Sequence, residues 1–153
     1  MQVPEGGAVL GLDLGGVVFH PLGGQVPGAL AHIERIASAG RFRSIYIVSR
    51  ANGPNRLYFL LRLSLMRFWR RTGLMRTRLY FCSRNSGKAA ICERFGITHF
   101  VDDRPDVLRR LGTVPRLFAF RPDGKELRKF PELRDRVVIV EGWGELARLL
   151  AEE

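Results

Sequence analysis

Cysteine is scarce in this chain of 153 residues, which has only Cys82 and Cys92. Their spacing fits neither a zinc-ligand pattern nor the disulfide framework of a small secreted domain. We therefore expect two thiols in the core and a reduced, cytoplasmic setting.

Long hydrophobic runs are also missing. No stretch approaches the roughly 20 apolar residues of a membrane-spanning helix, and the N-terminus lacks the basic and apolar segments of a secretion signal. We therefore expect no membrane partner. The hydrophobic content of 46% is enough for one sizeable core. These features predict a single domain over residues 1–153.

Acidic residues are few, 15 against 25 lysines and arginines, so the formal net charge is +10. Clustered cations can bind nucleic acid by releasing counterions from its phosphates. Here the arginines are spread along the chain, apart from a cluster at 66–78, and no zinc-finger, RRM or KH signature accompanies them. A nucleic-acid partner is therefore an alternative that we do not favour over a solvated basic surface.

What the chain does contain is an alternation of apolar, β-rich runs with helical segments. The expected strands are 8–13, 44–49, 78–83, 97–103, 116–120 and 136–140. The expected helices are 27–40, 54–73, 87–96, 105–112 and 142–152. Near-continuous apolar strands alternating with helices predict an α/β fold whose parallel sheet is covered on both faces.

Polar residues follow several of the predicted strands. Asp13 ends the first, Ser49 the second, and Asp102 with Asp103 the fourth, while Lys88 lies in the helix after the third. Ligands of open α/β sheets bind beyond the carboxyl ends of the strands, so these groups should converge. Neighbouring carboxylates repel unless a cation lies between them, which indicates bound Mg²⁺. A serine hydroxyl and a lysine ammonium beside that ion suit a phosphate ligand.

Four ordered motifs resemble those of the haloacid dehalogenase-like (HAD) hydrolase superfamily. They are "VLGLDLGGVV", "IYIVS", the lone Lys88 of "NSGKAAICERFG", and "FVDDRPDVL". The resemblance covers about residue 8 to about residue 112. It implies a three-layer, Rossmann-like fold with a mainly parallel sheet of five to six strands. It also implies no sizeable cap domain, because one helix occupies most of the chain between Asp13 and Ser49.

The resemblance implies that the protein is a Mg²⁺-dependent phosphomonoester hydrolase. Asp13 would be the nucleophile and would form an aspartyl-phosphate. Ser49, Arg50 and Lys88 would bind the substrate, with Ser49 and Lys88 also acting in catalysis. The metal ligands would be Asp13, the backbone carbonyl of Gly15, Asp102 and Asp103, with Asp106 a weaker candidate. The motif "DDRPD" is similar to that of the 5′(3′)-deoxyribonucleotidases, so the expected partner is a small phosphorylated substrate, with a nucleotide as one candidate.

Gly15 departs from the family pattern, because most of these phosphatases carry there a second aspartate that acts as general acid and base. Such help is typically worth roughly 10²- to 10⁴-fold in rate. His20, in the same loop, is a candidate substitute. The alternative to an enzyme is a catalytically impaired module that uses the acidic crevice or the basic surface to bind nucleic acid or a protein.

The predicted helix 54–73 is apolar almost all round, which allows two interpretations. It could be an internal helix packed on two sides, with Arg62 and Arg67 reaching solvent. It could instead contact a second subunit and make a homo-oligomer. The side chains available for that contact are Tyr58, Phe68 and Trp69.

Overall fold

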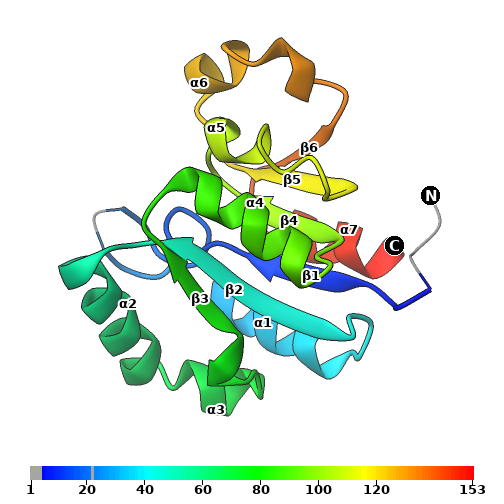
Figure 1. The fold of residues 1–153 in the computed structure, drawn as a ribbon. Helices are drawn as coiled ribbons and strands as arrows, with labels where there is room; N and C mark the ends of the chain where they lie inside the picture. The colour runs from blue at the N-terminus through cyan, green and yellow to red at the C-terminus, as the bar shows by residue number, and fades with distance from the viewer. Residues whose placement is uncertain (1–4, 22) are drawn as a thin grey trace.

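A parallel sheet of six strands forms the centre of the computed structural model, which describes residues 5–21 and 23–153 (Figure 1). The strand order is β3-β2-β1-β4-β5-β6, and every pairing is parallel. The strands are β1 (Val9–Leu12), β2 (Ser44–Arg50), β3 (Leu79–Cys82), β4 (His99–Asp102), β5 (Arg116–Phe120) and β6 (Val137–Val140). The predicted α/β class and sheet are confirmed.

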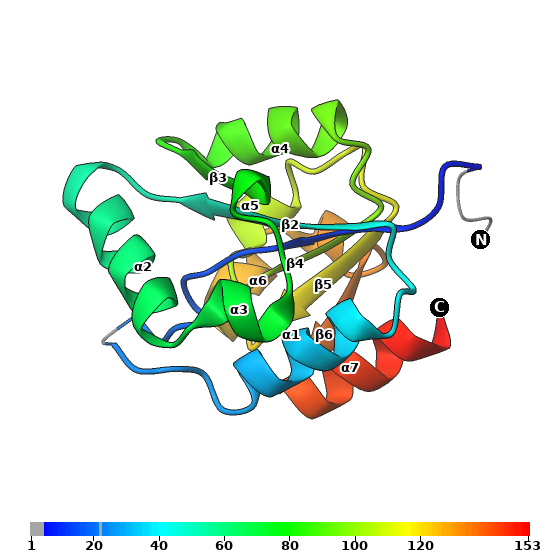
Figure 2. The same cartoon turned by 90° about the horizontal axis from the view of Figure 1, so that it is seen from below.

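Helices cover both faces of the sheet, as the view from below shows (Figure 2). One face carries α1 (Ala29–Ser38), α3 (Phe68–Thr72) and α7 (Trp143–Glu152). The other carries α4 (Asn85–Arg94), α5 (Pro105–Leu108) and α6 (Gly124–Arg128). The remaining elements are α2 (Gly53–Leu65) and the 3₁₀ turns η1 (Arg76–Arg78) and η2 (Pro131–Leu133).

The core consists of two clusters, one on each side of the sheet, because successive strand residues point to opposite faces. In β1, Leu10 and Leu12 join the cluster with α1 and α7, and Val9 joins the other. Gly11, between Leu10 and Leu12 in the strand, has no space for a side chain, because a Cβ there would be 2.5 Å from the Phe100 ring. β1 is therefore fixed at the centre of the sheet, with its carboxyl end leading into Asp13.

The predicted helix 54–73 is wrong as one element, because the chain turns between α2 and α3. Arg67 has a left-handed φ of 55°, a conformation that ends a right-handed helix. The internal-helix interpretation is wrong for α2, where Leu63 is the one fully buried side chain. Phe68 is buried as well, so it cannot contact a second subunit, whereas Tyr58 is 41% exposed.

Other differences are small. α6 and the two 3₁₀ turns were not predicted, and the predicted helix 105–112 is α-helical only over Pro105–Leu108. Both cysteines are free, as expected, but only Cys92 is fully buried. In the part of the chain that the structure describes, no helix combines the length and apolar character needed to cross a bilayer.

Candidate active site

The first strand leads directly into the site. The Asp13 N–H donates to the Val101 carbonyl at 3.1 Å, which extends the β1–β4 pairing by one residue and holds Asp13 at the sheet edge. The chain then turns sharply, and three successive N–H groups from Val17 to Phe19 donate to the Leu14 carbonyl. Gly16 makes this turn possible with its φ of 79°.

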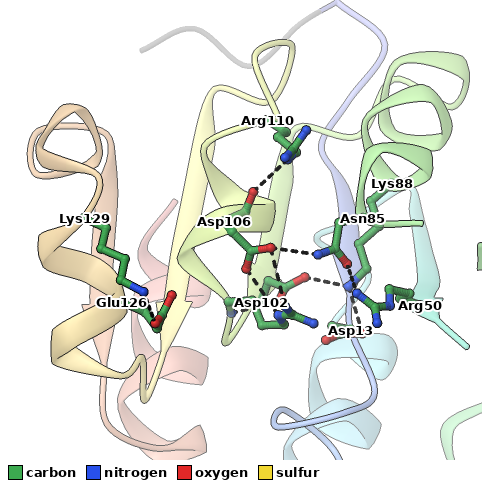
Figure 3. Close-up of polar contacts among 10 residues, drawn as sticks. Asp13, Arg50, Asn85, Lys88, Asp102, Asp106, Arg110, Glu126 and Lys129 are labelled. Carbon is green, nitrogen blue, oxygen red and sulfur yellow. Dashed lines mark hydrogen bonds and ion pairs between the residues drawn. The ribbon is translucent and has the colours of Figure 1, made fainter. Parts of the chain in front are cut away.

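Lys88 lies between two of the predicted carboxylates (Figure 3). Its Nζ is 3.0 Å from Asp13 Oδ1 and 2.7 Å from Asp102 Oδ2, and its side chain is 1% exposed. Lys88 comes from the first turn of α4, whereas the aspartates follow β1 and end β4. The buried Ser49, near the end of β2, lines the same cavity. The convergence predicted from the strand ends is therefore observed.

Asp102 and Asp103 have different surroundings. Asp102 is fully buried, and its second oxygen, Oδ1, accepts from the Arg104 N–H at 3.0 Å. Asp103 Oδ1 is also buried but has no hydrogen-bond partner among the described residues. Asp13, Asp102 and Asp103 each offer an oxygen, and these oxygens lie within 4.8 Å of one another. Such an oxygen-only donor set suits a hard divalent cation.

Burial is the largest influence on the pKa values of the three carboxylates in this cluster. It raises the pKa of Asp13 to about 6, against the opposing charge of Lys88. Burial and the charge of Asp13 raise the pKa of Asp103 to about 6 as well, and burial raises that of Asp102. Burial disfavours the Lys88 ammonium, but Asp13 and Asp102 outweigh it and raise its pKa. One lysine faces three carboxylates, so a divalent cation would balance the excess negative charge.

A cavity of about 250 Å³ opens over the cluster. Of the predicted residues, it is lined by Asp13, Gly15, Ser49, Arg50, Lys88 and Asp103. Asp102 does not line it, because it lies fully buried behind Lys88. His20 is not a lining residue either, and its backbone closes a turn with Gly23 and Gly24. The structure therefore does not favour His20 as a substitute acid.

Asp106 belongs to the rim of the cavity rather than to the cation cluster. Its carboxylate accepts from Asn85 Nδ2 at 2.7 Å and from Arg104 Nε at 3.2 Å. Asn85 Oδ1 in turn accepts from Arg50 Nη1 at 3.2 Å (Figure 3). This chain of contacts holds Arg50 and Arg104, two cations, at the opening of the cavity.

Several lining residues were not predicted. They are Gly16, Pro21, Ala51, Asn52, Asn55, Ser83, Asn85 and Arg104. Ser83 and Asn85 follow the end of β3, so the rule that located Asp13 and Ser49 could also have found them. The same rule could have found Asn52, which follows the end of β2, whereas Asn55 carries no such signal because its position depends on the direction in which α2 leaves the sheet.

Known proteins resemble this chain in fold and not in sequence. No protein-family model matches this sequence, and no curated protein does. Solved structures do match. Among them, a D,D-heptose 1,7-bisphosphate phosphatase from Burkholderia thailandensis is 18% identical, with 95% of this chain and 99% of that chain covered and a TM-score of 0.65.

Two further matches are a phosphatase and a putative hydrolase. The cobalt-bound deoxy-D-mannose-octulosonate 8-phosphate phosphatase from Haemophilus influenzae is 12% identical, covering 95% of this chain and 88% of that one, with a TM-score of 0.61. A putative HAD family hydrolase from Streptomyces avermitilis is 15% identical, covering 99% and 87%, with a TM-score of 0.54.

These likenesses define the class of fold, a three-layer Rossmann-like α/β architecture. More narrowly, the chain shares its fold with two phosphatases and a putative HAD family hydrolase, the superfamily that the four motifs resemble. At such low identity the likeness establishes the fold alone, and chemistry must be argued from the site.

Proposed function

We propose that this protein is a Mg²⁺-dependent phosphomonoester hydrolase of the HAD type that acts through an aspartyl-phosphate on Asp13. The observation that carries the proposal is the buried cluster at the cavity floor, where Lys88 contacts Asp13 and Asp102 while Asp103 keeps an oxygen without a partner among the described residues. An isolated buried carboxylate oxygen is costly, so such an atom indicates a ligand that the fold is built to receive.

The residues present fit a magnesium ion. Asp13, Asp103 and the Gly15 carbonyl would hold it, because Asp103 has the unpartnered oxygen and Gly15 lines the cavity. Gly16 keeps the approach clear, since a Cβ there would be 2.1 Å from Asp103 Oδ2. Asp102 would mainly hold Lys88, because both of its oxygens already accept hydrogen bonds. When bound, Mg²⁺ would reduce the repulsion between the phosphate and the carboxylates.

Asp13 would attack the phosphorus, and the bond from phosphorus to the ester oxygen would break as the alkoxide leaves. Ser49 would donate its hydroxyl hydrogen to a phosphoryl oxygen, and Lys88 would neutralise charge on the transferring group while holding Asp13 in place. Water would then attack the phosphorus of the aspartyl-phosphate, releasing inorganic phosphate and restoring the Asp13 carboxylate. Arg50 would hold the substrate at the cavity opening.

The leaving group receives no proton from residue 15, because Gly15 has no side chain. Turnover should therefore favour substrates whose leaving group is stable as an anion, such as aryl or acyl phosphates. The "DDRPD" motif supports a nucleotide among the phosphomonoester substrates to be tested. The two free thiols support a reducing, cytoplasmic location.

Gly15 also favours a second candidate, a catalytically impaired module that binds a partner through the same crevice. This candidate requires the cluster to bind Mg²⁺ or a phosphorylated ligand without turnover. The separated polar groups Asp13, Ser49 and Lys88, which all line one cavity, support the enzyme instead.

Phosphate release tests the proposal. Purified protein with Mg²⁺ would be assayed on aryl, sugar and nucleoside phosphomonoesters and on an acyl phosphate, which is a mixed anhydride. The variants Asp13→Asn and Asp106→Asn, the latter at the rim, would be assayed alongside. We expect Asp13→Asn to abolish release, while Asp106→Asn keeps the greater part of it because its carboxylate supports only the rim contacts. Mg²⁺ binding without turnover on any substrate would favour the binding module.

A further inference from the structure

Helix α2 presents an exposed apolar surface that no part of the described structure covers. We call it the α2 stripe, and it comprises Leu57, Tyr58, Leu60, Leu61 and Leu65. These side chains are between 41% and 81% exposed. Residues three and four apart share one side of a helix, so Leu57, Leu61 and Leu65 form one row with Leu60 beside it. A contiguous exposed surface of this kind marks an interaction site.

The opposite side of α2 is already used for packing. Leu63 is fully buried, and Phe59 stacks on Phe19 and Phe81 with ring centroids 5.9 and 6.4 Å apart. The helix is therefore anchored by one side and cannot roll to bury the other. Figures 1 and 2 show α2 standing away from the sheet, outside the carboxyl end of β2.

The stretch of sequence that contains the α2 stripe carries charge of one sign. Every charged residue between Glu34 and Glu93 is an arginine or lysine. Helical geometry places Arg56 on one side of the α2 stripe and Arg62 on the other. Exposed Arg70 and Arg76 follow in α3 and η1. The occupant of this surface must therefore combine an apolar part with negative charge.

A second copy of this chain does not meet that requirement, because pairing the same surface would bring arginines together in a protein of net charge +10. Nucleic acid supplies the negative charge, but its phosphate backbone offers no apolar surface for leucines. A bilayer containing anionic lipids supplies both, and short helices with an apolar face bordered by arginines lie in its interface.

We propose that the α2 stripe and its flanking arginines form a peripheral docking surface for an anionic membrane. The helix lies in the plane of the interface, with the leucines among the acyl chains and the arginines at the phosphate level. Asn52 and Asn55, at the start of α2, line the cavity, so the membrane lies next to the cavity opening. The expectation of no membrane partner came from the absence of a spanning segment, which an interfacial helix does not need.

Vesicle co-sedimentation of the full chain tests this surface without relying on any catalytic activity. The vesicles are phosphatidylcholine alone, or phosphatidylcholine with about 30% phosphatidylglycerol, the anionic lipid that should attract the arginines. We expect retention on the anionic vesicles, weaker retention on the neutral ones, and release by high salt.

Two matched pairs of variants locate the contact. Leu65→Gln should lose about tenfold or more in vesicle partition, whereas Ile139→Gln, the same kind of change at an exposed apolar residue on β6, should not. The double variant Arg70→Gln/Arg76→Gln should lose about tenfold in vesicle partition. The exposed pair Arg128→Gln/Arg134→Gln is distant from α2 and changes the charge equally, so its partition should fall less than about threefold. Circular dichroism and thermal melting check that each variant is folded.

The proposal is overturned if the folded protein fails to sediment with anionic vesicles. Equal losses in the test and control variants would also overturn it, because binding would then follow net charge alone. So would an RNA or an acidic polypeptide that binds through the α2 stripe when vesicles do not.

Discussion

At the scale of single residues, the site depends on two adjacent glycines with different roles. Gly16 has a left-handed backbone and leaves space for the Asp103 carboxylate. Gly15 does not have a left-handed φ, and among the described atoms a Cβ there would meet only Phe59 Cζ, at 3.9 Å. The backbone requires glycine at residue 16 but not at residue 15. The missing general acid therefore reflects the choice of side chain and not a lack of space.

Replacing Gly15 by aspartate should therefore supply a general acid. We expect Gly15→Asp to raise hydrolysis of alkyl phosphates by about 10²-fold and that of aryl phosphates much less, because good leaving groups need no proton. Gly15→Asn is the control of equal size without a proton to donate. Steady-state rates measure both. Equal rates for the two variants would show that residue 15 does not face the leaving group.

Replacing Gly16 by alanine should disrupt the cation cluster. Gly24 is the matched control, since it has a similar φ of 84° and a Cβ added there would meet no described atom within 4 Å. Both variants should lose about 1–2 kcal/mol of unfolding free energy through backbone strain. Only Gly16→Ala should also lose Mg²⁺ affinity, measured by calorimetry. Unchanged affinity in Gly16→Ala would exclude Asp103 as a ligand.

At the scale of elements, the segment between β2 and β3 shows where the sequence was insufficient. Hydrophobic periodicity located all six strands and most helices, because buried apolar runs are a local signal. The break after Met66 carries no such signal, since it depends on the backbone of Arg67. The exposure of α2 also could not be predicted, because an all-round apolar helix is usually buried.

Arg67 should be a strained residue whose replacement by glycine stabilises the protein. With φ at 55°, Arg67→Gly should raise the free energy of unfolding by about 1 kcal/mol, because glycine adopts this conformation without the Cβ clash. Arg67→Ala removes the same exposed side chain but keeps the Cβ, so it should give no such gain. Urea unfolding compares the two. A glycine variant no more stable than the alanine variant would show that the backbone of Arg67 is not strained.

At the scale of the whole molecule, parallel pairing brings together groups that are far apart in sequence. Asp13, Ser49 and Asp102 could be predicted because they lie at the carboxyl ends of strands that pair in one sheet, and Lys88 because it opens the helix that follows β3. Their individual roles could not. The unpartnered oxygen on Asp103 and the two accepted hydrogen bonds of Asp102 depend on side-chain geometry that strand positions do not specify.

The raised carboxylate pKa values predict how pH couples to metal binding. Asp13 and Asp103 have a pKa of about 6 against 3.8 in the unfolded chain, so the folded metal-free protein holds their protons more tightly. Its stability should therefore fall as pH rises from about 4 through about 6. Mg²⁺ must displace these protons when it binds. Below about pH 6, each protonated carboxylate should therefore lower the Mg²⁺ affinity by up to about tenfold for every unit that the pH falls.

Thermal melting with and without Mg²⁺ measures this coupling. The rise in Tm on adding Mg²⁺ should be large above pH 7 and small at pH 5. Asp103→Asn should lose most of it at every pH. A rise in Tm that does not change over this range would contradict the assignment of these carboxylates as ligands.

Phosphorylation of Asp13 during turnover is the step on which the proposed chemistry depends. The most direct measurement is acid quenching of the protein during reaction with Mg²⁺ and an aryl phosphate, followed by mass spectrometry of the peptide that contains residue 13. We predict a phosphoryl group on Asp13 that disappears without Mg²⁺ and is absent from Asp13→Asn. Phosphate release that continues in Asp13→Asn, with no phosphoryl group on this peptide in the native protein, would contradict a mechanism through an aspartyl-phosphate on Asp13.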